Sequence, residues 1–247
     1  MRIVALGASN LTRGLYSLVS TARAVWGRDV QVLAACGHGR SYGAGSHFII
    51  RTLPAILASG LWRQIEASPD VQTKALVTDV GNDILYGCRA EQVLAWVDEA
   101  IGRFRRVTSD IVVTDLPLVS ARRLSRVKFL AFRSMLFPSC RLSLDEVLET
   151  ADQVNQGLVR LAAAHHIRFF RLDPAWYGFD PIHIRPTFWR AAWQDILGMG
   201  SPPSEHSWIE ALRLYAMRPE RQWILGVEQV TPQCGVALWS GGRVWLY

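Results

Sequence analysis

Short apolar runs alternate with longer amphipathic stretches along most of the chain. The short runs predict five buried strands, at Arg2–Leu6, Val30–Ala35, Lys74–Val80, Asp110–Thr114 and Ile167–Leu172. The longer stretches predict helices at Leu11–Trp26, His47–Ile65, Ala90–Phe104, Leu144–His165 and Thr187–Leu197, with Pro54 beginning or kinking a segment of the second. Strands and helices that alternate in this way are typical of βαβ units. We therefore predict an α/β fold in which helices cover both faces of a parallel sheet.

The last forty residues break this alternation. The segment "QCGVALWSGGRVWLY" predicts a β-hairpin, because alternating apolar residues flank the turn Ser240-Gly241-Gly242. No internal repeat and no low-complexity linker divides the chain. We therefore expect a single domain over residues 1–247, with a core at about 2–198 and a C-terminal extension at about 205–247.

Composition narrows the class of protein. Half of the residues are hydrophobic and 19% are charged, which is typical of a well-packed globular chain. No uncharged apolar run reaches the roughly 18 residues that a membrane-spanning helix needs. No basic segment with a cleavage site precedes the first strand, so we expect a cytoplasmic location if Met1 is the natural start. The scattered cysteines argue against zinc and disulfide frameworks and agree with a reducing compartment: Cys36, Cys88, Cys140 and Cys234.

The net charge of +6 is concentrated in one segment. Residues 103–141 hold nine Lys and Arg against two Asp, so the rest of the chain is close to neutral. A local excess of this kind does not favour nucleic-acid binding. Within it, residues 118–137 mix arginines with large apolar residues. This segment is either an ordinary surface helix with one face on the domain, or a lid that makes peripheral contact with an anionic membrane.

Ser9 follows the first predicted strand, at the point where the first helix begins. One interpretation is a helix N-cap, a common use of serine at such turns. The other is a nucleophile exposed at the edge of the sheet, where backbone N–H groups favour negative charge. The two interpretations are compatible, and the sequence around Ser9 leaves both open.

Three further loops follow predicted strands, and parallel strands bring such loops to one edge of the sheet. The first is rich in glycine (Gly37, Gly39, Gly43 and Gly45) and lacks the spacing of known phosphate-binding motifs. The second is Gly81-Asn82-Asp83, either a turn or an amide donor for an oxyanion. The third is "DPIH", in which Asp180 can orient His183 as a base.

Taken together, these loops resemble those of the SGNH (GDSL-like) hydrolase family. The resemblance is carried by Ser9 in "GASNL", Gly39 in "CGHGRS", Asn82 in "GND", and Asp180 with His183 in "DPIH", and it spans residues 2 to about 198. It implies a flavodoxin-like three-layer sandwich around a five-stranded parallel sheet, to which the C-terminal hairpin is an addition. The chain departs from the family's Gly-Asp-Ser-Leu, because Ala8 and Asn10 flank Ser9.

The resemblance also implies a function and a role for each residue. Ser9 would be the nucleophile, His183 the base and Asp180 its orienting carboxylate. The oxyanion hole would comprise the N–H groups of Ser9 and Gly39, with Gly37 as the alternative, and the Asn82 side chain. This chemistry cleaves small-molecule or lipid-like esters and needs no metal or cofactor. The alternatives are an acyltransferase that uses the same residues and a non-catalytic binding module on the same fold.

Three further residues are candidates for substrate contact. Arg40 follows the proposed oxyanion glycine, and Asp83 follows Asn82. Trp176 lies near the histidine loop, where an aromatic ring would suit a sugar, although large aromatic residues usually fill cores.

Overall fold

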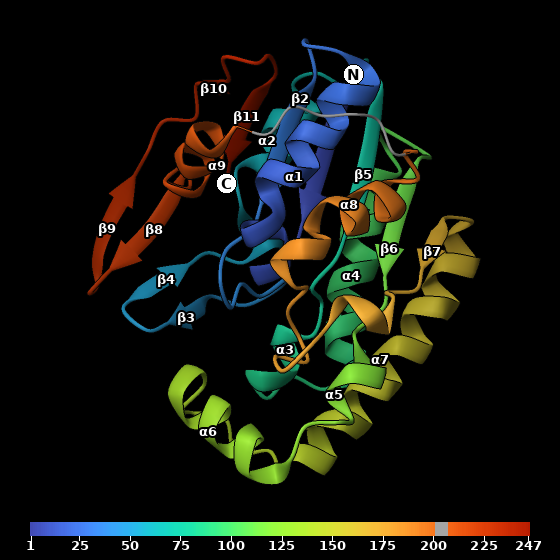
Figure 1. Ribbon diagram of the computed structural model, residues 1–247, viewed down its shortest axis with the longest axis vertical. Coiled ribbons are helices and arrows are strands. Elements are labelled where there is room, and N and C mark those ends of the chain that lie inside the picture. Colours follow the sequence, from blue (N-terminus) through green and yellow to red (C-terminus); the bar gives the residue numbers. More distant parts are fainter. Residues whose placement is uncertain (201–206) are drawn as a thin grey trace.

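The computed structural model describes residues 1–200 and 207–247 and is built around a mostly parallel sheet of seven strands. The strand order is β10-β11-β2-β1-β5-β6-β7 (Figure 1). Five of these strands are those predicted, at β1 (Arg2–Leu6), β2 (Gln31–Ala35), β5 (Thr73–Val77), β6 (Ile111–Thr114) and β7 (Arg168–Phe170). They are all parallel, in the doubly wound order of flavodoxin-like folds.

Helices cover both faces of this sheet, as predicted. Every residue of β1 is buried, and its side chains alternate between two apolar cores. Ile3 and Ala5 face the core that contains α1 (Ser9–Trp26) and α8 (Trp189–Leu197). Val4 and Leu6 face the core that contains α2 (Leu61–Glu66), α4 (Ala90–Phe104) and α7 (Leu144–His165). A strand buried on both faces has no polar side, which explains its continuous apolar run.

The predicted helix at His47–Ile65 is wrong over most of its length. The chain instead forms β3 (Ser46–Phe48), β4 (Arg51–Leu53), the 3-10 turn Ile56–Ala58 and then α2. β3 and β4 belong to a second, antiparallel sheet of order β3-β4-β8-β9, with β8 at Arg221–Ile224 and β9 at Val227–Val230. One of the two partners of β4 is its neighbour β3, and the other, β8, is a strand far along the chain, which local periodicity does not reveal.

The C-terminal hairpin is confirmed, and it extends the main sheet. β10 (Val236–Ala237) pairs antiparallel with β11 (Arg243–Leu246), and β11 lies parallel to β2. Gly241 adopts a φ of +100° in the turn, a conformation that favours glycine. Residues 205 and 206, where the extension was expected to begin, lie outside the described residues.

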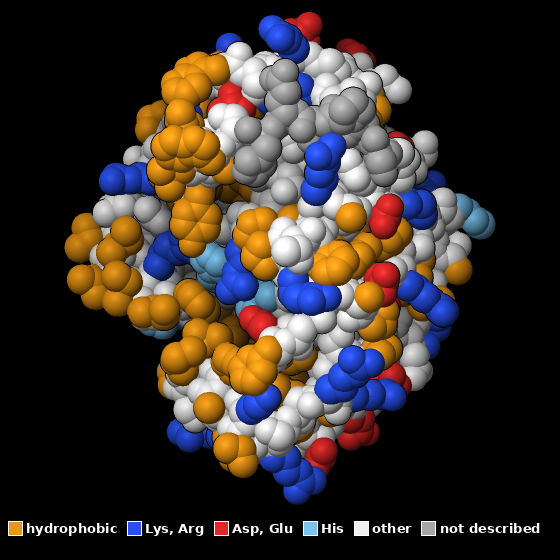
Figure 2. All heavy atoms as spheres, viewed as in Figure 1, with side chains coloured by type: hydrophobic (Ala, Val, Ile, Leu, Met, Phe, Trp, Pro, Cys, Tyr) orange, Lys and Arg blue, Asp and Glu red, His pale blue; other side chains and the backbone are white. Residues whose placement is uncertain are grey.

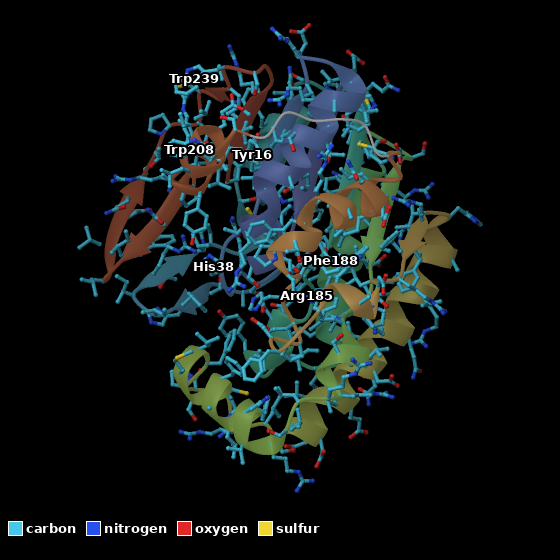
Figure 3. The ribbon with its side chains drawn as sticks, viewed as in Figure 1. Tyr16, His38, Arg185, Phe188, Trp208 and Trp239 are labelled. Carbon is cyan, nitrogen blue, oxygen red and sulfur yellow. The ribbon has the colours of Figure 1, made fainter. Side chains whose placement is uncertain are left out.

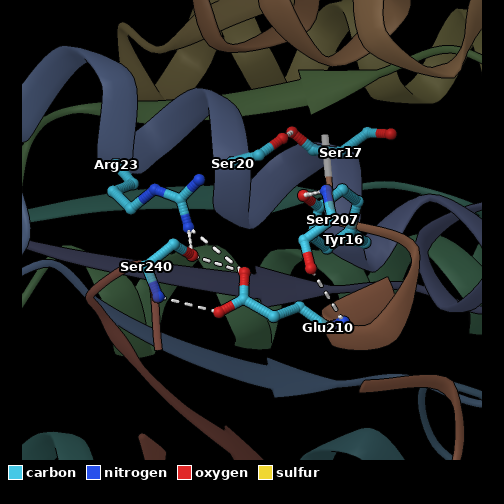
Figure 4. Close-up of polar contacts among 7 residues, drawn as sticks. All are labelled: Tyr16, Ser17, Ser20, Arg23, Ser207, Glu210 and Ser240. Atoms are coloured by element: carbon cyan, nitrogen blue, oxygen red, sulfur yellow. Dashed lines mark hydrogen bonds and ion pairs between the residues drawn. The ribbon is translucent and has the colours of Figure 1, made fainter. Parts of the chain in front are cut away.

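A polar cluster joins this extension to α1. Glu210, on α9 (Trp208–Tyr215), is almost fully buried and accepts hydrogen bonds from the backbone N–H and the hydroxyl of Ser240 (Figure 4). Arg23 of α1 lies 3.5 Å from the same carboxylate. Burial alone would raise the pKa of Glu210, but the hydrogen bonds from Ser240 and the charge of Arg23 hold that pKa below its usual range.

Candidate active site

Ser9 is the first residue of α1 and does not cap the helix. Ala8 occupies the N-cap position, and its own side chain makes no capping hydrogen bond. The Ser9 hydroxyl is directed to the histidine loop, where its Oγ lies 2.9 Å from Nε2 of His183. Of the two interpretations of Ser9, the helix N-cap is therefore wrong.

His183 is held from its other side by Asp180. Nδ1 of the imidazole lies 2.6 Å from a carboxylate oxygen of Asp180, which orients the ring and directs Nε2 to Ser9. Burial alone would raise the pKa of Asp180. The hydrogen bond and charge of His183, the N–H of Ile182 and the charge of Arg13 outweigh it and hold that pKa below its usual range. Asp180 is therefore ionised at neutral pH and available to stabilise a cationic His183.

Asn10 and Asp79 fix the position of these groups, and the sequence analysis missed both. The buried Asn10 amide donates to Asp79, at 2.8 Å, and to the carbonyl of Ile182, at 3.0 Å. Its oxygen accepts from the N–H of Ile184, at 2.8 Å. Asp79 also accepts from the N–H groups of Ala8 and Leu11. The available signal was the position of Asn10 beside Ser9 and of Asp79 at the end of a buried strand.

The proposed oxyanion donors reach the same cavity as Ser9 and His183. Gly39 and Asn82 both line it. The φ of Gly39 is +69°, and a Cβ there would lie 2.8 Å from the Phe48 ring, so this position favours glycine. Asn82 begins α3 (Asn82–Leu85), and its amide nitrogen lies 3.4 Å from the carbonyl of Arg40, a long hydrogen bond.

The cavity has a volume of about 300 Å³ and an apolar wall. It opens in a notch of the surface where Figure 2 shows histidine side chains bordered by hydrophobic ones. The basic segment 118–137 forms two helices, α5 (Leu118–Ala121) and α6 (Arg126–Leu136), and α6 supplies much of this wall. A smaller apolar cavity of about 120 Å³ shares Ser9 and Asn82 and extends toward α7.

The structure corrects the three residues expected to contact substrate. Arg40 is fully buried and donates to the backbone carbonyls of Cys36, Pro54 and Tyr247. Its guanidinium therefore bonds to the protein interior and does not face the cavity. Asp83 is also buried and accepts from the Ser41 hydroxyl and the Tyr42 N–H. Trp176 packs in the core with its ring 6.1 Å from Phe170. Arg40 and Trp176 are large side chains that the fold uses for packing.

Two other features of the described residues bear on the site. Within residues 1–200 and 207–247, no group of three His, Cys, Asp or Glu lies close enough together to hold a metal ion. In the same ranges, no helix has the length and apolar character needed to cross a membrane.

The fold is that of the SGNH (GDSL-like) hydrolases, as the resemblance implies. A member of the lipolytic protein G-D-S-L family from Veillonella parvula aligns at a TM-score of 0.51 and 15% identity, over 82% of this chain and 100% of its own. Est24, a carbohydrate acetylesterase from Sinorhizobium meliloti, aligns at 0.53 and 12% identity, over 80% and 97%. No family model and no curated protein sequence matches the chain.

Proposed function

We propose that the protein is a serine hydrolase that cleaves an ester through an acyl-enzyme. The observation that carries this proposal is the hydrogen-bonded chain from Ser9 through His183 to Asp180, which faces an apolar cavity. A serine, an imidazole and a carboxylate in this order are the groups that nucleophilic acyl transfer needs. The fold shared with esterases agrees with this chemistry.

In the proposed mechanism, Nε2 of His183 takes the proton of Ser9 as Oγ attacks the ester carbonyl carbon. Asp180 stabilises the imidazolium that forms. The N–H groups of Ser9 and Gly39 and the amide of Asn82 bind the oxyanion of the tetrahedral intermediate. This intermediate collapses, His183 protonates the departing alcohol, and water then attacks the acyl-enzyme by the same sequence of steps.

Hydrolysis of a series of p-nitrophenyl esters tests the proposal. We expect wild-type turnover that is abolished in Ser9→Ala and severely reduced in His183→Ala. Asn82→Ala removes one oxyanion donor and should lower kcat by ~10²–10³. Turnover by a folded Ser9→Ala at the wild-type rate would refute the assignment.

The alternatives are outcomes of the same assay. An ester formed with an added alcohol would identify an acyltransferase, and binding of an ester without turnover would identify a binding module. Contact of residues 118–137 with a membrane surface and a cytoplasmic location stay predictions of the sequence.

A further inference from the structure

Two arginines, Arg13 and Arg51, act on His38, a residue that lines the cavity. Arg13 lies one helical turn after Ser9 on α1 and lines the same cavity. Arg51 lies on β4, with a guanidinium nitrogen 3.5 Å from the position a Cβ on Gly37 would take. Both side chains are half-buried. Neither makes a hydrogen bond or an ion pair with any residue in 1–200 or 207–247, whereas Arg23 and Arg103 pair with carboxylates.

The charges of Arg13 and Arg51 both act on the imidazole of His38. His38, which is labelled in Figure 3, lines the cavity. Its ring stacks on that of Phe48 with the centroids 5.9 Å apart. Burial, followed by the charges of Arg13, Arg51 and His183, lowers the pKa of His38 to about 4. His38 is therefore neutral near pH 7 and adds no positive charge to the cavity. The carboxylate that lines the cavity, Asp180, is already bonded to His183.

The cavity thus has two unlike sides. Toward α6 and α7 its wall is mostly apolar, formed by residues such as Phe129, Phe132 and Leu148. The one charged side chain of α6 that lines it, Arg133, donates to the carbonyl of Leu142. Toward α1 and the glycine-rich loop it presents Arg13 and His38, and the charge of Arg51, beside Gly37, also acts on His38. The charge of Arg13 acts on the Asp180 carboxylate, which is already bonded to His183. Two half-buried arginines that form no ion pair within residues 1–200 and 207–247 favour an anionic ligand.

We propose that Arg13 and Arg51 form an anion subsite, and that the substrate is an ester with one apolar part and one part bearing a carboxylate or phosphate. This proposal rests on the proposed function. The apolar acyl chain lies against α6 and α7, and the anionic group of the alcohol part is bound by Arg13. The charge of Arg51, which acts on His38, adds to the positive potential. The subsite therefore selects among esters by the charge of the alcohol part.

A matched pair of substrates tests this inference. The butyryl esters of 4-hydroxyphenylacetic acid and of its amide have similar leaving groups and differ by one negative charge. We expect wild-type kcat/KM to favour the acid by at least ~10-fold, about the effect of one charge-assisted hydrogen bond. The preference should lie mainly in KM, because the charge is distant from the reacting atoms. Added NaCl should reduce it.

Three variants connect the preference to these residues. Arg13→Gln should bring the ratio of the two kcat/KM values close to one, and Arg51→Gln should lower it partly. Arg13→Lys keeps the charge and should keep most of the preference. The control is Arg160→Gln, which removes the same charge from an exposed position of α7 and should leave the ratio at its wild-type value.

The outcomes separate the two proposals. If the wild type hydrolyses both esters equally well, or if Arg13→Gln slows both equally, the anion subsite is refuted while the hydrolase stands. If the wild type turns over neither ester faster than Ser9→Ala does, the proposed function fails, and the subsite fails with it.

Discussion

Asn10 should control catalysis although it touches no reacting atom, because it holds both chain neighbours of His183. Its amide donates to the carbonyl of Ile182 and accepts from the N–H of Ile184. Asn10→Ala leaves these two backbone groups without that partner and removes one donor from Asp79. A buried polar group without a partner costs about 1–3 kcal/mol, so we expect a loss of about 3–5 kcal/mol in the free energy of unfolding.

The effect on reactivity should exceed the effect on folding. A shift of His183 by about 1 Å from Ser9 is enough to slow acyl transfer by ~10². The assay is the second-order rate of labelling by a fluorophosphonate, measured well below the melting temperature of each variant.

Asn155→Ala is the matched control for this prediction. Asn155 also bonds across elements, to the N–H of Leu116 at 2.7 Å and to its carbonyl at 3.3 Å. Asn155→Ala should lower the free energy of unfolding and be labelled at a rate within about threefold of wild type, since Asn155 bonds to Leu116 and to neither neighbour of His183. A folded Asn10→Ala that labels at the wild-type rate would refute the reasoning.

Three other predictions concern stability. Glu210→Gln should lower the free energy of unfolding by about 3 kcal/mol, because it leaves the charge of the largely buried Arg23 side chain without its carboxylate partner. The pKa of Glu210 is lowered in the folded protein, so its contribution to the stability of the wild type is lost as the pH falls below about 4.5. Urea titrations at several pH values should show this loss in the wild type and not in Glu210→Gln. His38 has a folded pKa of about 4 against 6.5 when unfolded, so it makes stability fall as the pH drops between these values. After allowance for partial exposure the fall is about 1–2 kcal/mol, and His38→Gln should remove it. Gly14→Ala places a Cβ on the indole of the buried Trp193 and should lower the melting temperature strongly, whereas Gly102→Ala, with open space at the same kind of helical position, should raise it slightly. Equal melting temperatures for the two glycine variants would contradict this packing.

The parts of the fold that sequence predicted well are those set by local periodicity. The bounds of β1, α4 and α7 agree with the prediction residue for residue. β1 is a continuous apolar run buried on both faces, and α4 and α7 each bury a regular apolar stripe. The helix predicted over the region of β3 and β4 was wrong because the conformation there is not set by local periodicity. That conformation depends on pairing with β8, about 170 residues later, and an apolar stretch interrupted by Pro54 suits either state.

The site shows the same division between local and distant causes. Parallel strands bring their carboxyl ends to one edge, so the meeting of the Ser9, Asn82 and His183 loops followed from the order of elements alone. The role of Asn10 depends on contacts with residue 182 and residue 184, which no spacing in the sequence reveals. Arg40 was misassigned because its sequence position gives no sign that its charge is bonded to backbone carbonyls in the interior.

The most direct test of the account is covalent labelling with a fluorophosphonate, read by intact mass for wild type, Ser9→Ala and His183→Ala. An activated serine predicts a single adduct on the wild type, which is absent from Ser9→Ala and forms much more slowly on His183→Ala. A folded wild type without an adduct, or an adduct that persists in Ser9→Ala, would contradict the central claim that His183 activates Ser9.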